Sequence, residues 1–131
     1  VVPLQFAFQE GLVRYMLTRN PTLDTTTFDP DTNPAAVGAL SAVLDATNPN
    51  LQQFRASGGK LILWHGASDP AISYKGTTRY YQQAVAANGG QAAADQFIRY
   101  YVAPGVLHCS GGPGADSADL LAALDDWVTR N

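Results

Sequence analysis

The sequence predicts an α/β fold built around a parallel βαβ unit. Residues 61–64 are four large apolar residues between a glycine pair and a single glycine, the pattern of a strand buried on both faces. Residues 97–102 form a second apolar run, and residues 73–88 between the two runs have the spacing of a helix. A strand, a helix and a strand within about forty residues form a crossover unit, and such units place their strands parallel.

Size and composition restrict the chain to one domain at most and argue against several classes of partner. Of its 131 residues, 46% are apolar and only 15% are charged, and the formal net charge is −3. The eight Lys and Arg residues are scattered singly, so we expect no nucleic-acid partner. No apolar run approaches the roughly 18 residues that span a bilayer, so we expect no membrane association.

The first part of the chain predicts helices and loops. Residues 5–18 carry a broad apolar stripe at helical spacing. Asn33 and Pro34 are expected to be the N-cap and first residue of a second helix. Asn48 and Pro49 repeat this pair before a short segment that leads to the central strand.

Three acidic residues lie in the polar loop after the first predicted helix, and they allow two interpretations. Asp24, Asp29 and Asp31 could ligate calcium, but their spacing lacks the glycine and the terminal glutamate of an EF-hand loop. Pro30 also separates two of them. We therefore favour hydrogen bonds to turns and helix ends over a metal site.

The end of the chain predicts one more helix. A glycine-rich loop at residues 111–114 precedes Asp116 and Ser117, and either side chain can accept a first-turn amide hydrogen bond as the N-cap. The face expected to be buried consists of Leu120, Leu121, Leu124, Trp127 and Val128.

Two polar residues follow the two predicted strands. Asp69 lies one short turn after the first strand, and His108 lies in the loop after the second. Functional groups of open α/β sheets gather at the carboxyl ends of the strands, and acid before histidine is the order of the last two triad residues in α/β-hydrolases. The alternatives are that Asp69 only begins the next helix through an Asp-Pro turn, and that His108 is an ordinary loop histidine.

A nucleophile with suitable geometry is missing from the sequence. No Gly-x-Ser-x-Gly turn or close variant precedes Asp69, and Ser57 leads into a strand instead of leaving one. Ser110 and Cys109 are too close to His108 along the chain to reach its ring at the required angle. We therefore expect this chain to be the C-terminal part of a larger enzyme.

Several other residues have competing interpretations. Cys109 is the single cysteine, so it is a buried free thiol, a reactive thiol, or half of a bridge to a segment outside this chain. His65 ends the central strand and is expected to be packed with its ring nitrogens satisfied. Tyr74, Tyr80 and Tyr81 are assigned to the core or helix surface in preference to an aromatic pocket.

Several stretches of the sequence together resemble the tannase and feruloyl esterase family. The resemblance rests on GGKLILWHGASDP at 58–70, the tyrosine pair at 80–81, VAPGVLHCSGGPG at 102–114 and LDATNPNLQQF at 44–54. It covers most of the chain from about residue 40. The His-Cys-x-Gly-Gly-Pro-Gly element is specific, whereas other α/β-hydrolases use variants of His-Gly-x-x-Asp-Pro.

The resemblance implies a fold and an activity. The fold class is α/β, the C-terminal part of an α/β-hydrolase sheet that is incomplete on its own. Residues 1–50 would be the end of a helical lid or its return, and residues 51–131 the C-terminal part of the hydrolase domain. The family implies a secreted or periplasmic serine esterase that cleaves esters of aromatic acids such as gallate and ferulate, or, in one branch, terephthalate monoesters.

The resemblance also implies roles for individual residues. Asp69 and His108 would be the triad acid and base, and the serine would lie upstream in a Cys-Ser-x-Gly-Gly turn whose cysteine is bridged to Cys109. The chemistry would need no cofactor, although a structural calcium is implied in the lid. The partners would be a small aromatic ester and the rest of the parent chain, and the isolated chain should self-associate through its open sheet edge. The competing readings are a non-catalytic hydrolase-like binding domain, or one subunit of a clipped two-chain esterase.

Overall fold

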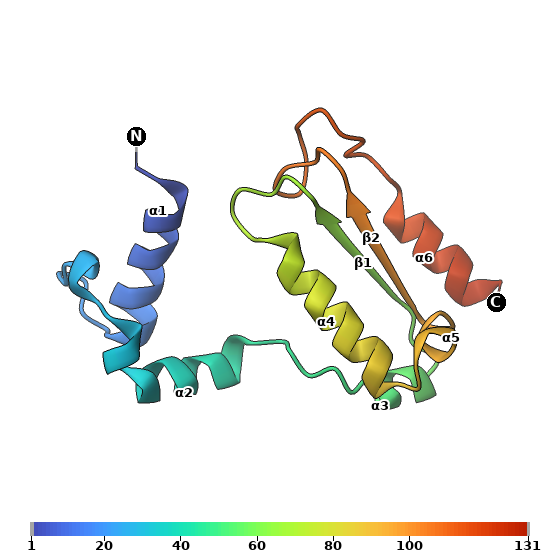
Figure 1. The fold of residues 1–131 in the computed structure, drawn as a ribbon, viewed down its shortest axis with the longest axis horizontal. Coiled ribbons are helices and arrows are strands. Elements are labelled where there is room, and N and C mark those ends of the chain that lie inside the picture. The colour runs from blue at the N-terminus through green and yellow to red at the C-terminus, as the bar shows by residue number, and fades with distance from the viewer. Residues whose placement is uncertain (1, 131) are drawn as a thin grey trace. The chain divides into compact units, whose positions relative to one another are not determined.

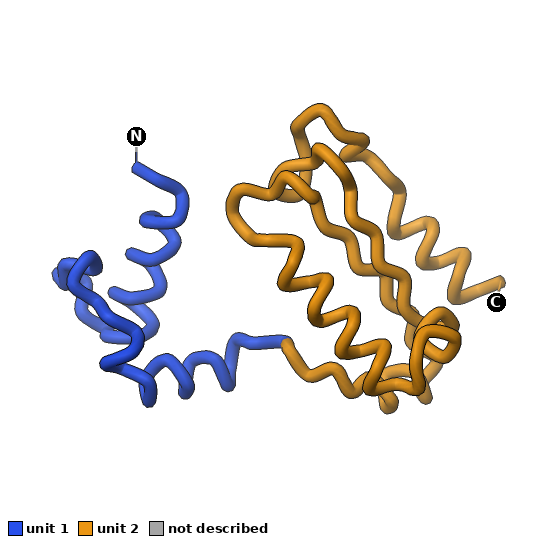
Figure 2. The backbone as a smooth tube through the Cα atoms, in the orientation of Figure 1, with its two compact units in different colours: residues 1–46 blue, residues 47–131 orange. Residues whose placement is uncertain are grey.

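The structure is a computed structural model that describes residues 2–130. The chain divides into two compact units, Val1–Ala46 and Thr47–Asn131, shown in separate colours in Figure 2. Each unit is described by itself below. No helix within the described residues is both long and apolar enough to cross a membrane.

The first unit is helical. Helix α1 (Leu4–Gly11) continues directly into a π-helical segment, η1 (Leu12–Leu17), so the helix predicted for residues 5–18 is confirmed. Two short 3-10 turns, η2 (Thr25–Thr27) and η3 (Pro30–Thr32), follow in the polar loop. Helix α2 (Pro34–Leu44) begins at the predicted proline.

The acidic side chains of the polar loop form turn and cap hydrogen bonds. Asp24 Oδ1 accepts the Thr26 N–H at 3.0 Å, and Asp29 Oδ1 accepts the Asp31 N–H at 2.9 Å. Hydrogen bonds from the Thr26 hydroxyl and then its amide lower the pKa of Asp24. Asn33 occupies the N-cap position of α2, but its side chain donates to the Asp29 carbonyl instead of capping the helix.

The second unit contains the predicted βαβ crossover (Figure 1). Strands β1 (Leu61–Gly66) and β2 (Ile98–Ala103) pair in parallel, with Leu61 opposite Ile98. Helix α4 (Tyr74–Ala87) joins them, and the short helix α5 (Gln91–Ala94) leads into β2. The parallel α/β architecture is therefore confirmed.

The unit packs through the alternation of side chains along its strands. Leu61 and Leu63 pack with α4 against a buried cluster, whose fully buried members are Ala84, Ala94, Phe97 and Ile98. On the opposite face, the Lys60 ammonium and the Arg99 guanidinium lie 5.1 and 4.6 Å from the ring centre of Trp127. That tryptophan belongs to helix α6 (Leu120–Thr129), so α4 and α6 cover opposite faces.

The expectation that the central strand is buried on both faces is wrong for this chain. Residues Leu61–His65 are only half-buried, because β1 pairs with a strand on one side alone and one helix covers each face. The face of α6 predicted to be buried is only partly covered, since Leu120, Leu124 and Trp127 are half-buried whereas Leu121 is 78% and Val128 51% exposed.

Two helix starts differ from the prediction. Helix α3 (Gln52–Ala56) begins after the Asn48-Pro49 pair, because the Asn50 side chain accepts the Gln52 N–H at 3.1 Å. The N-cap of α6 is Asp119, which accepts the Ala122 N–H at 2.9 Å, and neither Asp116 nor Ser117. The N-cap position of α3 is Leu51, which makes no side-chain cap hydrogen bond, whereas the Asp119 side chain caps α6 directly.

Candidate active site

Two loops leave the carboxyl ends of the parallel strands and are joined by backbone hydrogen bonds. We call residues 67–73, after β1, the acid loop and residues 104–116, after β2, the histidine loop. The Ala67 N–H donates to the Ala103 carbonyl at 2.9 Å, and the Ser68 N–H donates to the Val106 carbonyl at 3.0 Å. The strand pairing therefore continues into the loops and fixes their separation.

Gly66 permits this close approach at the end of β1. A Cβ placed there would lie 2.4 Å from the carbonyl oxygens of both Val106 and Leu107. These backbone oxygens cannot move aside for a new side chain in the way that the far end of a flexible side chain can. Only glycine therefore lets the histidine loop cross the end of β1 at this distance.

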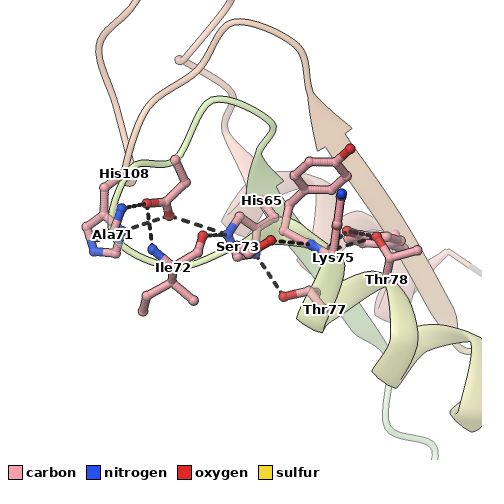
Figure 3. A network of polar contacts seen from close by, with 11 residues as sticks. His65, Ala71, Ile72, Ser73, Lys75, Thr77, Thr78 and His108 are labelled. Carbon is pink, nitrogen blue, oxygen red and sulfur yellow. Dashed lines mark hydrogen bonds and ion pairs between the residues drawn. The ribbon is translucent and has the colours of Figure 1, made fainter. Parts of the chain in front are cut away.

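Asp69 and His108, which lie 39 residues apart in sequence, are brought together at this edge (Figure 3). His108 Nδ1 lies 2.8 Å from Asp69 Oδ2. The other carboxylate oxygen, Oδ1, accepts the N–H groups of Ala71 at 2.7 Å and Ile72 at 2.9 Å. The aspartate thus both closes its own turn and bonds the histidine, but it does not start the next helix, because α4 begins at Tyr74 with Ser73 as its N-cap.

The environment of Asp69 keeps its carboxyl ionised. Its side chain is only 4% exposed, and burial is the largest single influence, opposing ionisation. The hydrogen bonds from Ile72, His108 and Ala71 and the charge of His108 have the opposite effect. Together they outweigh burial and lower the pKa of Asp69 to about 2.

His108 is the exposed partner of this pair. Its side chain is 48% exposed, and because Asp69 is ionised, Nδ1 carries the proton that it donates to the carboxylate. In the neutral ring Nε2 is then an acceptor. The arrangement can accept a proton at Nε2 and stabilise the resulting imidazolium, as a general base requires.

His65 is packed with its ring nitrogens satisfied, as predicted. Nδ1 lies 2.8 Å from Thr77 Oγ1, and Nε2 lies 3.0 Å from the Ile72 carbonyl oxygen. Nε2 is also 3.3 Å from Asp69 Oδ2, so this second histidine contacts the same carboxylate oxygen that bonds His108.

Cys109 is exposed, so the interpretation as a buried thiol is wrong. Its backbone is left-handed, with φ of 65°, a conformation uncommon for a residue with a side chain. It lies at a hollow of about 130 Å³. The residues around this hollow are Trp64, His65, Gly66, Asp69, Ile72, His108 and Cys109.

Two contributors to this geometry were not predicted from the sequence. The Ile72 N–H donates to Asp69, and the Ile72 carbonyl oxygen bonds His65. The sequence signal for the first contact is the Asp-Pro turn, because an aspartate in such a turn accepts hydrogen bonds from amides two and three residues later. Asp116, expected as a cap, instead accepts the Gly111 N–H at 2.6 Å and closes the histidine loop.

Neither Ser57 nor the tyrosines considered from the sequence border the hollow, whereas Ser110 lies in the histidine loop and its N–H donates to the His108 carbonyl at 2.8 Å. Ser57 bonds the Phe54 carbonyl ahead of β1, at the opposite end of the strand from Asp69. Tyr81 packs against the buried cluster, its ring 5.3 Å from that of Tyr100. Tyr80 bonds the Asn48 carbonyl, and none of the tyrosines borders the hollow.

The described residues do not form the calcium site that the family resemblance implies. No group of three or more His, Cys, Asp or Glu side chains is placed to hold a metal within residues 2–130. Asp24 and Asp29 are committed to turn hydrogen bonds.

A histidine bonded to a buried aspartate at the carboxyl edge of parallel strands, with helices on both faces, defines part of an α/β-hydrolase-type sheet. The chain belongs to the tannase and feruloyl esterase family, whose profile matches residues 3–131.

Individual relatives agree with this assignment. The chain is 42% identical over 111 residues to the mono(2-hydroxyethyl) terephthalate hydrolase of Piscinibacter sakaiensis, covering 79% of this chain and 18% of that protein. It is 30% identical over 131 residues to a probable feruloyl esterase of Arthroderma benhamiae, covering 95% and 24%. A crystal structure of an esterase from Aspergillus oryzae matches with a TM-score of 0.79 at 27% identity, over 91% of this chain and 27% of that one. The chain thus spans between 18% and 27% of the length of these proteins.

Proposed function

We propose that this chain is the C-terminal part of a serine carboxylic-ester hydrolase, with Asp69 as the triad acid and His108 as the general base. The observation that carries the proposal is the 2.8 Å bond between them, which occupies Nδ1 and leaves Nε2 as the acceptor nitrogen of the neutral ring. The nucleophilic serine would lie upstream of this chain in the intact protein.

The reaction would proceed in two halves. The serine hydroxyl attacks the ester carbonyl while His108 Nε2 takes its proton, and the imidazolium then gives that proton to the leaving alcohol. Water repeats the sequence on the acyl-enzyme and releases the acid. Asp69 holds the Nδ1–H tautomer and offsets the positive charge that develops on the ring.

We further propose that the substrate is an ester of an aromatic acid. The names of two relatives, a mono(2-hydroxyethyl) terephthalate hydrolase and a probable feruloyl esterase, support this class. Ile72 and Trp64 line the hollow beside the acid–histidine pair and are apolar residues. Which acid is preferred would depend on segments outside this chain.

Cys109 is proposed to form a disulfide with a cysteine beside the upstream serine, and the protein to be secreted or periplasmic, where such a bond persists. Its exposed position next to His108 supports the pairing, because a bridge there would tie the histidine loop to the nucleophile. Residues 1–46, one of the two compact units, are proposed to belong to a lid or its return.

The experiment uses the intact protein that carries this chain. His108→Ala should lower kcat toward methyl ferulate or a terephthalate monoester by about 10⁴-fold or more, because the general base is lost. Ser57→Ala, on the far side of the strand, is the matched control and should leave kcat unchanged. A His108→Ala variant with full activity, or a wild-type protein that binds these esters without cleaving them, would replace the esterase with a binding domain. Non-reducing electrophoresis would reveal a clipped partner chain held through Cys109.

A further inference from the structure

His65 is a second histidine that the mechanism above does not use. Its side chain is 13% exposed and lies between helix α4 and the acid loop. Three oxygen atoms surround its ring, from Thr77, Ile72 and Asp69 (Figure 3). A half-buried imidazole with two bonded nitrogens has a fixed orientation, because rotation about its side chain would break both bonds.

The surrounding groups determine which nitrogen of the neutral ring carries the proton. The Ile72 carbonyl oxygen is an acceptor only, so Nε2 must be the donor across the 3.0 Å contact. Nδ1 then accepts the hydroxyl proton of Thr77 at 2.8 Å. The same Nε2–H has Asp69 Oδ2 as a second, longer acceptor at 3.3 Å.

These contacts hold the acid loop at both ends of its turn. Within the turn, the Ile72 N–H donates to Asp69 Oδ1, and the Ile72 carbonyl is bonded by His65. His65 is in turn anchored through Thr77 to α4. These hydrogen bonds connect α4 to the carboxylate that faces His108.

We propose that His65, held in its Nε2–H tautomer by the Ile72 carbonyl and oriented by Thr77, is a positioning residue that sets the orientation of the Asp69 carboxylate toward His108. The inference rests on the proposed function. Loss of the Nε2 donor lets the turn at residues 69–72 rotate, which misplaces the acid while the substrate-contacting surface stays in place.

Substitutions at residue 65 in the intact protein test the role of this donor. His65→Asn has no donor that reaches the Nε2 position, and we expect kcat to fall about 10- to 100-fold with KM changed less than about twofold. His65→Gln places an amide N–H near the Nε2 position, and we expect it to recover most of the lost rate. If His65 were needed only for folding, both His65→Asn and His65→Gln would be less stable, and His65→Gln would not recover kcat.

Two adjacent threonines of α4 provide a matched pair of variants. Thr77→Val removes the hydroxyl that bonds Nδ1 and orients the His65 ring, and it should lower kcat several-fold. Thr78→Val removes bonds to Tyr100 and to the Tyr74 carbonyl, so it should lower thermal stability while leaving kcat unchanged. Equal effects of the two changes on kcat would overturn the positioning role.

Nitrogen-15 NMR of the histidine rings gives a readout that is independent of activity. We expect the spectrum of His65 to report a protonated Nε2 and an unprotonated Nδ1, and the Nδ1–H form would overturn the proposal. Unchanged kcat in both His65→Asn and Thr77→Val, with His108→Ala inactive, would also overturn it and leave the esterase intact. Full activity of His108→Ala would instead remove the proposed function, while the ring spectra would still test the hydrogen bonds.

Discussion

The acid loop holds Asp69 with hydrogen bonds from its own segment, whereas the histidine loop holds His108 through backbone packing. Asp69 accepts two amide hydrogen bonds from within three residues, and its side chain is 4% exposed. His108 has one side-chain bond, to Asp69, and is 48% exposed. The acid is therefore oriented by local turn chemistry, but the position of the base depends on how two loops pack together.

The largest effect should come from disturbing that packing at Gly66. In Gly66→Ala the new Cβ would meet two backbone carbonyl oxygens at 2.4 Å, so the histidine loop must move away. We expect a loss of about 1–3 kcal/mol in the free energy of unfolding. We also expect kcat to fall by about 100-fold, because small displacements of a catalytic base are costly. Denaturant unfolding and ester hydrolysis by the intact protein measure the two effects.

Gly76→Ala is the control for this change. Gly76 lies within α4, and a Cβ there meets nothing within 4 Å. The substitution should stabilise the protein by about 0.5–1 kcal/mol and leave kcat unchanged. If Gly66→Ala behaved in the same way as Gly76→Ala, the packing account of the histidine loop would be wrong.

The sequence could predict the parts of this site that local chemistry determines. The strand–helix–strand order placed Asp69 and His108 at one edge of the sheet, and Ser73 caps α4 at the expected residue. The Asp-Pro pair indicates a turn, and an aspartate in such a turn accepts hydrogen bonds from nearby backbone amides. These features depend on neighbours within a few residues or on a topological rule.

The remaining features depend on tertiary contacts, which the pattern of a single sequence does not predict. Asp116, Ser117 and Asp119 are all competent caps, and only the docking of α6 against β1 selects Asp119. The contact of His65 with Thr77 spans 12 residues and follows from the strand alternation that turns His65 toward α4. Burial of the central strand was overestimated because its apolar run describes a strand with neighbours on both sides.

A smaller effect is expected from Asp116, which closes the histidine loop. Asp116→Ala removes the acceptor of the Gly111 N–H, and we expect a loss of about 1 kcal/mol in stability and about a 10-fold lower kcat. Asp119→Ala removes a comparable bond, to the Ala122 N–H, in the N-cap of α6. It should cost similar stability and leave kcat unaffected, so a rate loss in both variants would count against a specific role of the loop closure.

The smallest expected effect is the pH dependence of the stability that Asp69 contributes. The pKa of Asp69 is lowered from 3.8 to about 2 in the folded protein, so ionised Asp69 contributes stability that is fully present above pH 3.8 and is lost as the pH falls toward 2. The difference in unfolding temperature between the wild type and Asp69→Asn should therefore be constant above pH 3.8 and narrow below it. A carboxyl-carbon NMR titration of Asp69 with its midpoint near 3.8 would contradict the hydrogen-bonded geometry. With the midpoint near 2, Asp69 stays ionised throughout the pH range of an esterase assay, and no loss of activity between pH 4 and 7 can be assigned to its protonation.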